Sequence, residues 1–134
     1  MLPVPTVAAV NGHAFGAGAM LALAHDHRVM RDDRGYVCLP EVDIHIPFSP
    51  GMNALVMSKL SPRAAVDSMT TGHRFPADEA LAAGIVDATA SLEDLAQAAA
   101  ARVEHLAGKD RTTLGTIKQR MYADVVAALR LPEV

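Results

Sequence analysis

The chain has 134 residues, of which 51% are hydrophobic and 20% charged, a balance that is typical of one globular domain or of part of a larger one and excludes a disordered chain. The formal net charge of −3 argues against a nucleic-acid-binding surface, and no apolar run reaches the roughly 18 residues that would suggest a membrane span. The single cysteine, Cys38, cannot form an internal disulfide, so we expect a protein of a reducing compartment, the cytoplasm, that binds neither nucleic acid nor membrane.

The first half of the chain predicts strands and a helix in alternation. The apolar run Thr6–Val10, bounded by a proline and by Asn-Gly, is typical of a buried strand. After a glycine loop, apolar residues predict a helix over about 18–24, and shorter runs predict strands over 27–30 and 36–39. Prolines interrupt the stretch 42–49, which we expect to be irregular.

Helices dominate the second half of the chain. Two Ser-Pro pairs, at 49–50 and 61–62, each place an N-capping serine before a proline at the first helical position. The predicted elements are helices over 51–59, 62–70, 77–83, 91–106 and 111–129, with a brief strand over 85–86. The last helix carries an amphipathic stripe at spacings of three and four, formed by Leu114, Ile117, Met121, Val125 and Leu129.

The glycine loop of Gly12, Gly16 and Gly18 brings a nearly bare backbone to the start of a helix. It lacks the Lys-Ser/Thr of a P-loop and the full dinucleotide-binding fingerprint, which argues against phosphate binding. Two uses stay open at this point. The glycines can serve tight packing of helix on strand, without chemistry. Alternatively, free amides at a helix start can stabilise a thioester or enolate oxygen, because small residues let that oxygen come close.

Three ordered motifs carry a resemblance to a known family. They are AVNGHAFGAGAMLALAHDHRV at 9–29, LPEVDIHIP at 39–47 and TGHRFPADEALAAGIVD at 71–87. Together they resemble the signature of the crotonase (enoyl-CoA hydratase/isomerase) superfamily. The resemblance implies an α/β fold in which 1–88 form the C-terminal half of a crotonase-type sheet-and-helix core. It also implies that 89–134 form a helical oligomerisation region, in a homotrimer or a dimer of trimers.

The resemblance also assigns the reacting groups. It implies that the backbone N–H of Ala17 is one of two donors to the oxygen of an acyl-CoA thioester, with Gly16 and Gly18 giving access, and that Glu41 is the catalytic carboxylate. Hydratases of the family carry a second glutamate where this chain has Met20, which cannot transfer a proton. One base can remove a proton from C2 and return one to C4, so we expect isomerisation of 3-enoyl-CoA to 2-enoyl-CoA.

Other residues are expected to bind the substrate. Met20, Pro47 and Phe48 are predicted to line the acyl site. His45 stands where the family commonly has glycine, so it either reshapes the acyl channel or faces solvent. Lys118 either meets a phosphate of coenzyme A, as helix lysines do in relatives, or lies on a solvated helix face. Coenzyme A is part of the substrate, so no separate cofactor is expected, and the histidines show no convincing metal-binding spacing.

Several alternatives stay open. From residues alone, Glu41 can be an ordinary solvated carboxylate at a strand end. The family fold is roughly twice as long, and its first half carries the other oxyanion amide in an Ala-Phe-x-Ala-Gly-x-Asp type motif that this chain lacks. The chain can therefore be an enoyl-CoA hydratase, can catalyse another crotonase reaction such as thioester hydrolysis or decarboxylation, or can be a truncated, non-catalytic acyl-CoA-binding or assembly subunit.

Overall fold

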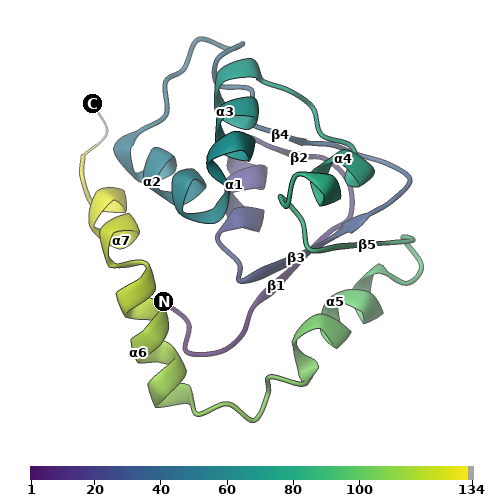
Figure 1. Ribbon diagram of the computed structural model, residues 1–134, viewed down its shortest axis with the longest axis vertical. Coiled ribbons are helices and arrows are strands. Elements are labelled where there is room, and N and C mark those ends of the chain that lie inside the picture. Colours follow the sequence, from purple (N-terminus) through teal and green to yellow (C-terminus); the bar gives the residue numbers. More distant parts are fainter. Residues whose placement is uncertain (133–134) are drawn as a thin grey trace.

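A computed structural model describes residues 1–132 and shows strands and helices in a mixed α/β arrangement (Figure 1). The elements in chain order are β1 (Val7–Val10), β2 (Ala14–Phe15), α1 (Ala17–Leu23), β3 (His27–Arg31), β4 (Val37–Cys38), α2 (Pro50–Lys59), α3 (Pro62–Thr71), α4 (Ala77–Ala82), β5 (Ala88–Ala90), α5 (Leu95–Glu104), α6 (Arg111–Met121) and α7 (Ala123–Leu129). The predicted α/β class is confirmed. Both Ser-Pro pairs begin helices as expected, since Ser49 and Ser61 accept hydrogen bonds from the amides three residues on.

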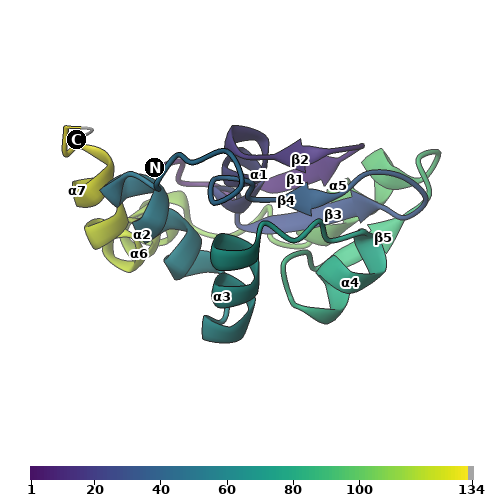
Figure 2. The same ribbon diagram turned by 90° about the horizontal axis from the view of Figure 1, so that it is seen from above.

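All strand pairs within the two sheets are parallel. The larger sheet has the order β1-β3-β5, with Val7 opposite His27 and Val29 opposite Ala88. The smaller sheet pairs β2 with β4, and an antiparallel bridge joins Val37 of β4 to Phe75. Figure 2 shows α3 and α4 together on one side of the strands. Parallel pairing brings the ends of β2 and β4 to the same edge, next to the start of α1.

The core is aliphatic and lies on both faces of the larger sheet. The main cluster gathers buried residues of α1, α2, α3 and α4 around the strands, with Leu23, Met30 and Leu39 among its largest side chains. A smaller cluster of Val29, Leu95 and Ala99 holds α5 against the other face. The expected helical region 89–134 thus contains the end of strand β5 as well as α5, a helix that packs on the sheet.

Three expectations about elements are wrong. The strand predicted over 85–86 lies at β5 instead, because Ile85 and Val86 form a buried turn whose amides both donate to the Ala80 carbonyl. Strand β2 lies where a glycine loop was expected, because two residues are too few to show the alternating hydrophobic pattern of a strand. The helix predicted over 111–129 is broken at Tyr122, whose φ of −114° and ψ of 20° separate α6 from α7.

The last two helices run along one edge of the molecule beside α2, away from β5 (Figure 1). Gly51 of α2 lies against the backbone of Leu129, and Gly115 of α6 lies against Pro3. Only Val125 of the predicted apolar stripe is buried, whereas Ile117, Met121 and Leu129 are about half exposed. The stripe therefore does not pack into this chain's own core. No helix of the described residues is both long and apolar enough to cross a bilayer.

Candidate active site

The glycine loop positions an amide at the first residue of α1. Gly16 precedes the helix with a φ of 51°, a left-handed conformation that favours glycine, and its N–H donates to the Cys38 carbonyl at 2.9 Å. Ala17 is the first helical residue, and amides of a first turn have no partner within the helix. No side chain within residues 1–132 caps this N-terminus, so the Ala17 N–H is available to an oxygen from outside.

Glu41 is buried beside this loop. Its residue is only 5% exposed, and Oε2 has no hydrogen-bond partner among the described residues. A methyl group added to Gly16 would lie 3.7 Å from Glu41 Oε1. The interpretation of Glu41 as a solvated carboxylate is therefore wrong. Burying a carboxylate oxygen without a hydrogen-bond partner costs free energy of folding. Such an oxygen beside the Ala17 amide therefore identifies a candidate active site.

An open cleft of about 400 Å³ extends from Glu41. Its walls come from the turn after β4 and from α2 and α3, and the lining residues are Glu41, Val42, His45, Ile46, Pro47, Phe48, Asn53 and Met69. The cleft thus brings together Glu41, His45, Pro47 and Phe48 from the predicted site. Sequence reasoning missed Asn53 and Met69, which belong to helices without any motif of their own. Met20 is elsewhere, 7% exposed in the main core.

His45 occupies a backbone position that suits glycine. Its φ is 61°, and it is the only non-glycine residue with positive φ in the described chain. This value supplies the physical reason for the glycine that the family commonly has here, since a Cβ crowds the backbone in the left-handed region. The side chain of His45 is exposed and lines the cleft, and its effect on an acyl channel stays a prediction.

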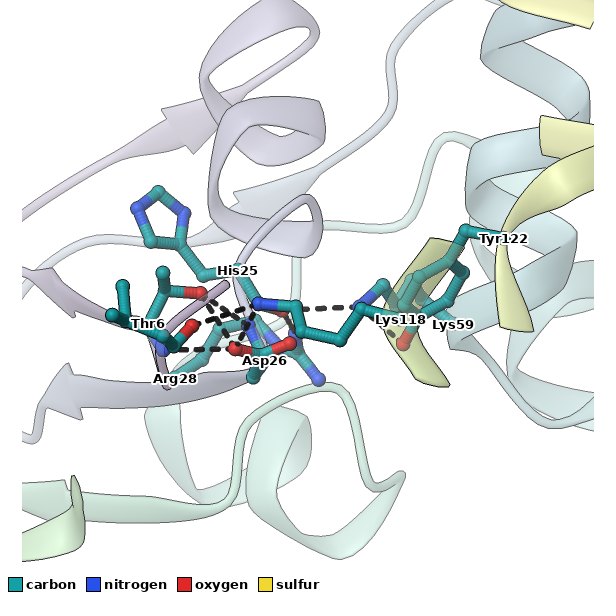
Figure 3. A network of polar contacts seen from close by, with 8 residues as sticks. Thr6, His25, Asp26, Arg28, Lys59, Lys118 and Tyr122 are labelled. Atoms are coloured by element: carbon teal, nitrogen blue, oxygen red, sulfur yellow. Dashed lines mark hydrogen bonds and ion pairs between the residues drawn. The ribbon is translucent and has the colours of Figure 1, made fainter. Parts of the chain in front are cut away.

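Lys118 is buried on α6, and the expectation of a solvated face is wrong. The side chain is 6% exposed, and Nζ donates to Asp26 Oδ2 at 2.8 Å and to the Val4 carbonyl at 2.9 Å (Figure 3). Asp26 Oδ2 also accepts from the N–H and hydroxyl of Thr6. Burial disfavours the Asp26 carboxylate, but the hydrogen bonds from Lys118 and Thr6 and the Lys118 charge together hold the pKa of Asp26 below its ordinary value. Asp26 therefore has a structural role, because it joins the segment before β1 to α6.

Two further cations, Lys59 and Arg28, lie beside this ion pair. Lys59 Nζ donates to the His25 carbonyl at 3.2 Å and to the Tyr122 hydroxyl at 2.9 Å, and Arg28 Nη1 donates to the same carbonyl at 2.9 Å (Figure 3). These contacts join the end of α1 to α2 and to the break between α6 and α7. Residues 1–132 contain no group of three metal-ligating side chains placed to hold an ion.

Comparisons with known proteins agree with this geometry. The profile of the enoyl-CoA hydratase/isomerase family matches residues 1–132. The chain is 40% identical over 129 residues to enoyl-CoA delta isomerase 3 of Arabidopsis thaliana, covering 92% of this chain and 54% of that protein. It is 38% identical over 135 residues to the peroxisomal enoyl-CoA delta isomerase 2 of the same plant, covering 97% of this chain and 56% of that protein.

Solved structures share the fold. An enoyl-CoA hydratase from Mycobacterium marinum superposes with a TM-score of 0.86 at 29% identity, covering 96% of this chain and 56% of that one. The chain thus spans about half the length of the curated relatives that it matches. Because the family profile covers nearly every residue and the isomerase relatives align along most of the chain, this protein belongs to the enoyl-CoA hydratase/isomerase (crotonase) family.

Proposed function

We propose that this chain isomerises 3-enoyl-CoA to 2-enoyl-CoA, with Glu41 as the only base and the Ala17 amide in the oxyanion hole. The observation that carries the proposal is the buried Glu41 carboxylate, which has an unpartnered oxygen and lies against Gly16, directly before Ala17. The aliphatic core residue Met20 occupies the place of the second glutamate of family hydratases, and this supports isomerisation over hydration. The two isomerases of Arabidopsis support the same choice.

The proposed reaction needs one carboxylate and one oxyanion site. The Glu41 carboxylate removes a proton from C2 of the 3-enoyl group, and the electron pair moves toward the thioester carbonyl to give a dienolate. The Ala17 N–H donates to the dienolate oxygen. Protonated Glu41 then delivers its proton to C4, which leaves the double bond between C2 and C3 and regenerates the carboxylate. One such amide donor is typically worth about 10² to 10³ in rate, so a second donor supplied from outside this chain would add a comparable factor.

The surroundings of Glu41 suit an acyl chain. Pro47, Phe48 and Met69 give the cleft apolar walls, and His45 stands at its edge. We propose that Lys118 binds a phosphate of coenzyme A. Its ammonium group has three N–H donors, of which Asp26 and Val4 accept two, so the third can donate to the phosphate. A homotrimer or dimer of trimers and a cytoplasmic location also remain our proposals, although two of the Arabidopsis relatives carry a peroxisomal name.

The proposal is tested by following the conjugated thioester in the ultraviolet after 3-enoyl-CoA is added to the purified chain, with hydration of crotonyl-CoA followed in parallel. Glu41→Gln should lower isomerisation by about 10³-fold or more, because general base catalysis commonly supplies 10² to 10⁴. Glu93→Gln is the matched control, because Glu93 is exposed on another part of the chain. Activity that survives Glu41→Gln, with the fold intact by circular dichroism, would overturn the assignment of the base.

Two other outcomes of the same assay favour the alternatives. The Mycobacterium marinum protein, to which this chain is similar in structure, is an enoyl-CoA hydratase, so hydration is followed beside isomerisation. Hydration that equals or exceeds isomerisation would favour a hydratase. Absence of both activities with retained binding of an acyl-CoA, measured by calorimetry, would favour a non-catalytic acyl-CoA-binding subunit.

A further inference from the structure

The end of helix α3 makes an unusually close contact with the turn that carries Glu41. Gly72 follows α3 with a φ of 65°. A Cβ added at Gly72 would lie 2.2 Å from Asp43 Oδ2 and 2.9 Å from Asp43 Cγ. The carboxylate of Asp43 thus fills the space that any side chain at position 72 would occupy. Position 72 favours glycine for its backbone conformation, and any side chain there would displace the exposed Asp43 carboxylate.

The contact is one of three that join these two segments. Val37 and Phe75 exchange both of their backbone hydrogen bonds, each at 2.9 Å. The Cys38 thiol donates to the Gly72 carbonyl at 3.4 Å. These two contacts hold β4, which lies before Glu41. Asp43, whose carboxylate packs against Gly72, comes after Glu41 in the chain, so contacts with the end of α3 lie on both sides of Glu41.

Glu41 depends on such external support. Among the described residues its Oε2 accepts no hydrogen bond, so the carboxylate is placed by the backbone that carries it. Within the turn, the amides of Ile44 and Ile46 donate to the carbonyls of Pro40 and Glu41, both at 3.0 Å. The turn also contains His45, whose left-handed backbone opposes this geometry. Its internal hydrogen bonds therefore need a fixed point outside the turn.

We propose that Asp43 and Gly72 are positioning residues, which lock the turn against the end of α3 and so hold the Glu41 carboxylate beside Gly16 and Ala17. Neither residue touches the reacting atoms. Their effect on the rate depends on the isomerase activity proposed above. Their effect on the position of the Glu41 carboxylate does not depend on that activity. A displacement of about 1 Å in a reacting group can cost about 10² in rate.

The chain offers a matched pair of glycines for the test. Gly72→Ala puts a methyl group where Asp43 lies. Gly84→Ala introduces the same strain, since Gly84 has a φ of 70°, but a Cβ there meets nothing within 4 Å. We expect Gly72→Ala to lower kcat by 10- to 100-fold with KM nearly unchanged, and Gly84→Ala to leave both near the original values.

Two variants of Asp43 separate positioning from loss of stability. Asp43→Asn keeps the shape of the side chain and should retain activity within about threefold. Asp43→Ala removes the contact with Gly72 without any change of residue at position 72 and should lower kcat into the same range as Gly72→Ala. If Asp43→Ala keeps the original kcat, or Gly84→Ala is as poor as Gly72→Ala, the loss in Gly72→Ala reflects backbone strain and the proposal is wrong.

An NMR comparison tests the same point without any activity. Because Glu41 Oε1 lies against Gly16, replacing the carboxylate by Glu41→Gln should shift the Gly16 amide resonance. This response should be lost when Glu41→Gln is made in Gly72→Ala, and kept when it is made in Gly84→Ala or Asp43→Asn. An inactive chain that shows this pattern would refute the isomerase proposal and support the positioning role. A Gly16 response that Gly72→Ala leaves intact would overturn the positioning role.

Discussion

Asp26 shows how a single residue ties together distant parts of the chain. Its Oδ2 accepts from Thr6 at the entry to β1 and from Lys118 of α6, 92 positions away. A carboxylate in that setting has a clear linkage to pH. The pKa of Asp26 is lower in the folded chain than its ordinary value of 3.8. Its stabilising contribution is therefore complete well above pH 3.8, decreases as the pH falls below that value, and is lost as the pH passes through the folded pKa.

The matching prediction concerns Asp26→Asn. This change leaves the buried Lys118 ammonium without its counter-charge and should lower the free energy of unfolding by about 2 kcal/mol near pH 7. The difference from the original chain should shrink as the pH falls below 3.8. Urea unfolding followed by circular dichroism at several pH values measures both. A difference that stays constant down to pH 2 would show that the ion pair is not its source.

The backbone of His45 leads to a second prediction for a single residue, because its φ of 61° is sterically strained. His45→Gly removes the strain but frees the unfolded chain, so we expect a net gain of about 0.5 kcal/mol. His45→Val places a branched side chain in the same conformation and should cost about 2 kcal/mol. Thermal unfolding of the two variants checks the ordering. Equal melting temperatures for glycine and valine would mean that the turn does not keep this backbone in solution.

Helix boundaries with a local chemical signal were predictable from the sequence. The two Ser-Pro pairs placed α2 and α3 to within one residue. Elements defined by distant contacts were not predictable. Strand β5 depends on pairing with β3, and the break at Tyr122 coincides with a hydrogen bond from Lys59, 63 positions away. The apolar pair Ile85 and Val86 looked like a strand because a buried turn and a buried strand have the same hydrophobic pattern.

The contact between α2 and α7 leads to a prediction for whole elements. A Cβ added at Gly51 would lie 2.7 Å from Leu129 Cα, and backbone cannot move aside as a side chain can. Gly51→Ala should therefore push α7 away from α2, even though alanine favours helix elsewhere. We expect faster amide exchange across 123–129 and a loss of about 1 to 2 kcal/mol in stability.

Gly108→Ala is the control for this contact, because a Cβ at Gly108 meets nothing within 4 Å. Exchange measured by mass spectrometry should be unchanged in α7 for that variant. Equal protection of 123–129 in Gly51→Ala would show that α7 does not rest on Gly51 in solution.

Only part of the candidate active site could be predicted from the sequence. Glu41, Pro47 and Phe48 belong to one continuous motif, so the sequence placed them together and the structure gathers them in one cleft. Asn53 and Met69 complete its walls from two helices, and only the packing of α2 and α3 on the turn reveals them. The burial of Lys118 followed no local signal either, because its partners Asp26 and Val4 lie at the other end of the chain.

The outer face of α6 supports a prediction for the assembled molecule. Ile117 is 48% exposed and Met121 is 64% exposed, one turn apart on α6, and both line the same hollow as the partly buried Leu114. An apolar pair of this kind is costly in water and favours a subunit contact, in agreement with the proposed trimer. Changing both Ile117 and Met121 to glutamate should reduce the mass measured by light scattering to that of one chain, with the helix content preserved. Val66→Glu, on the exposed side of α3, should leave the mass unchanged. A chain that is monomeric before any substitution would show that α6 does not join identical copies, and the apolar pair would then need a different partner.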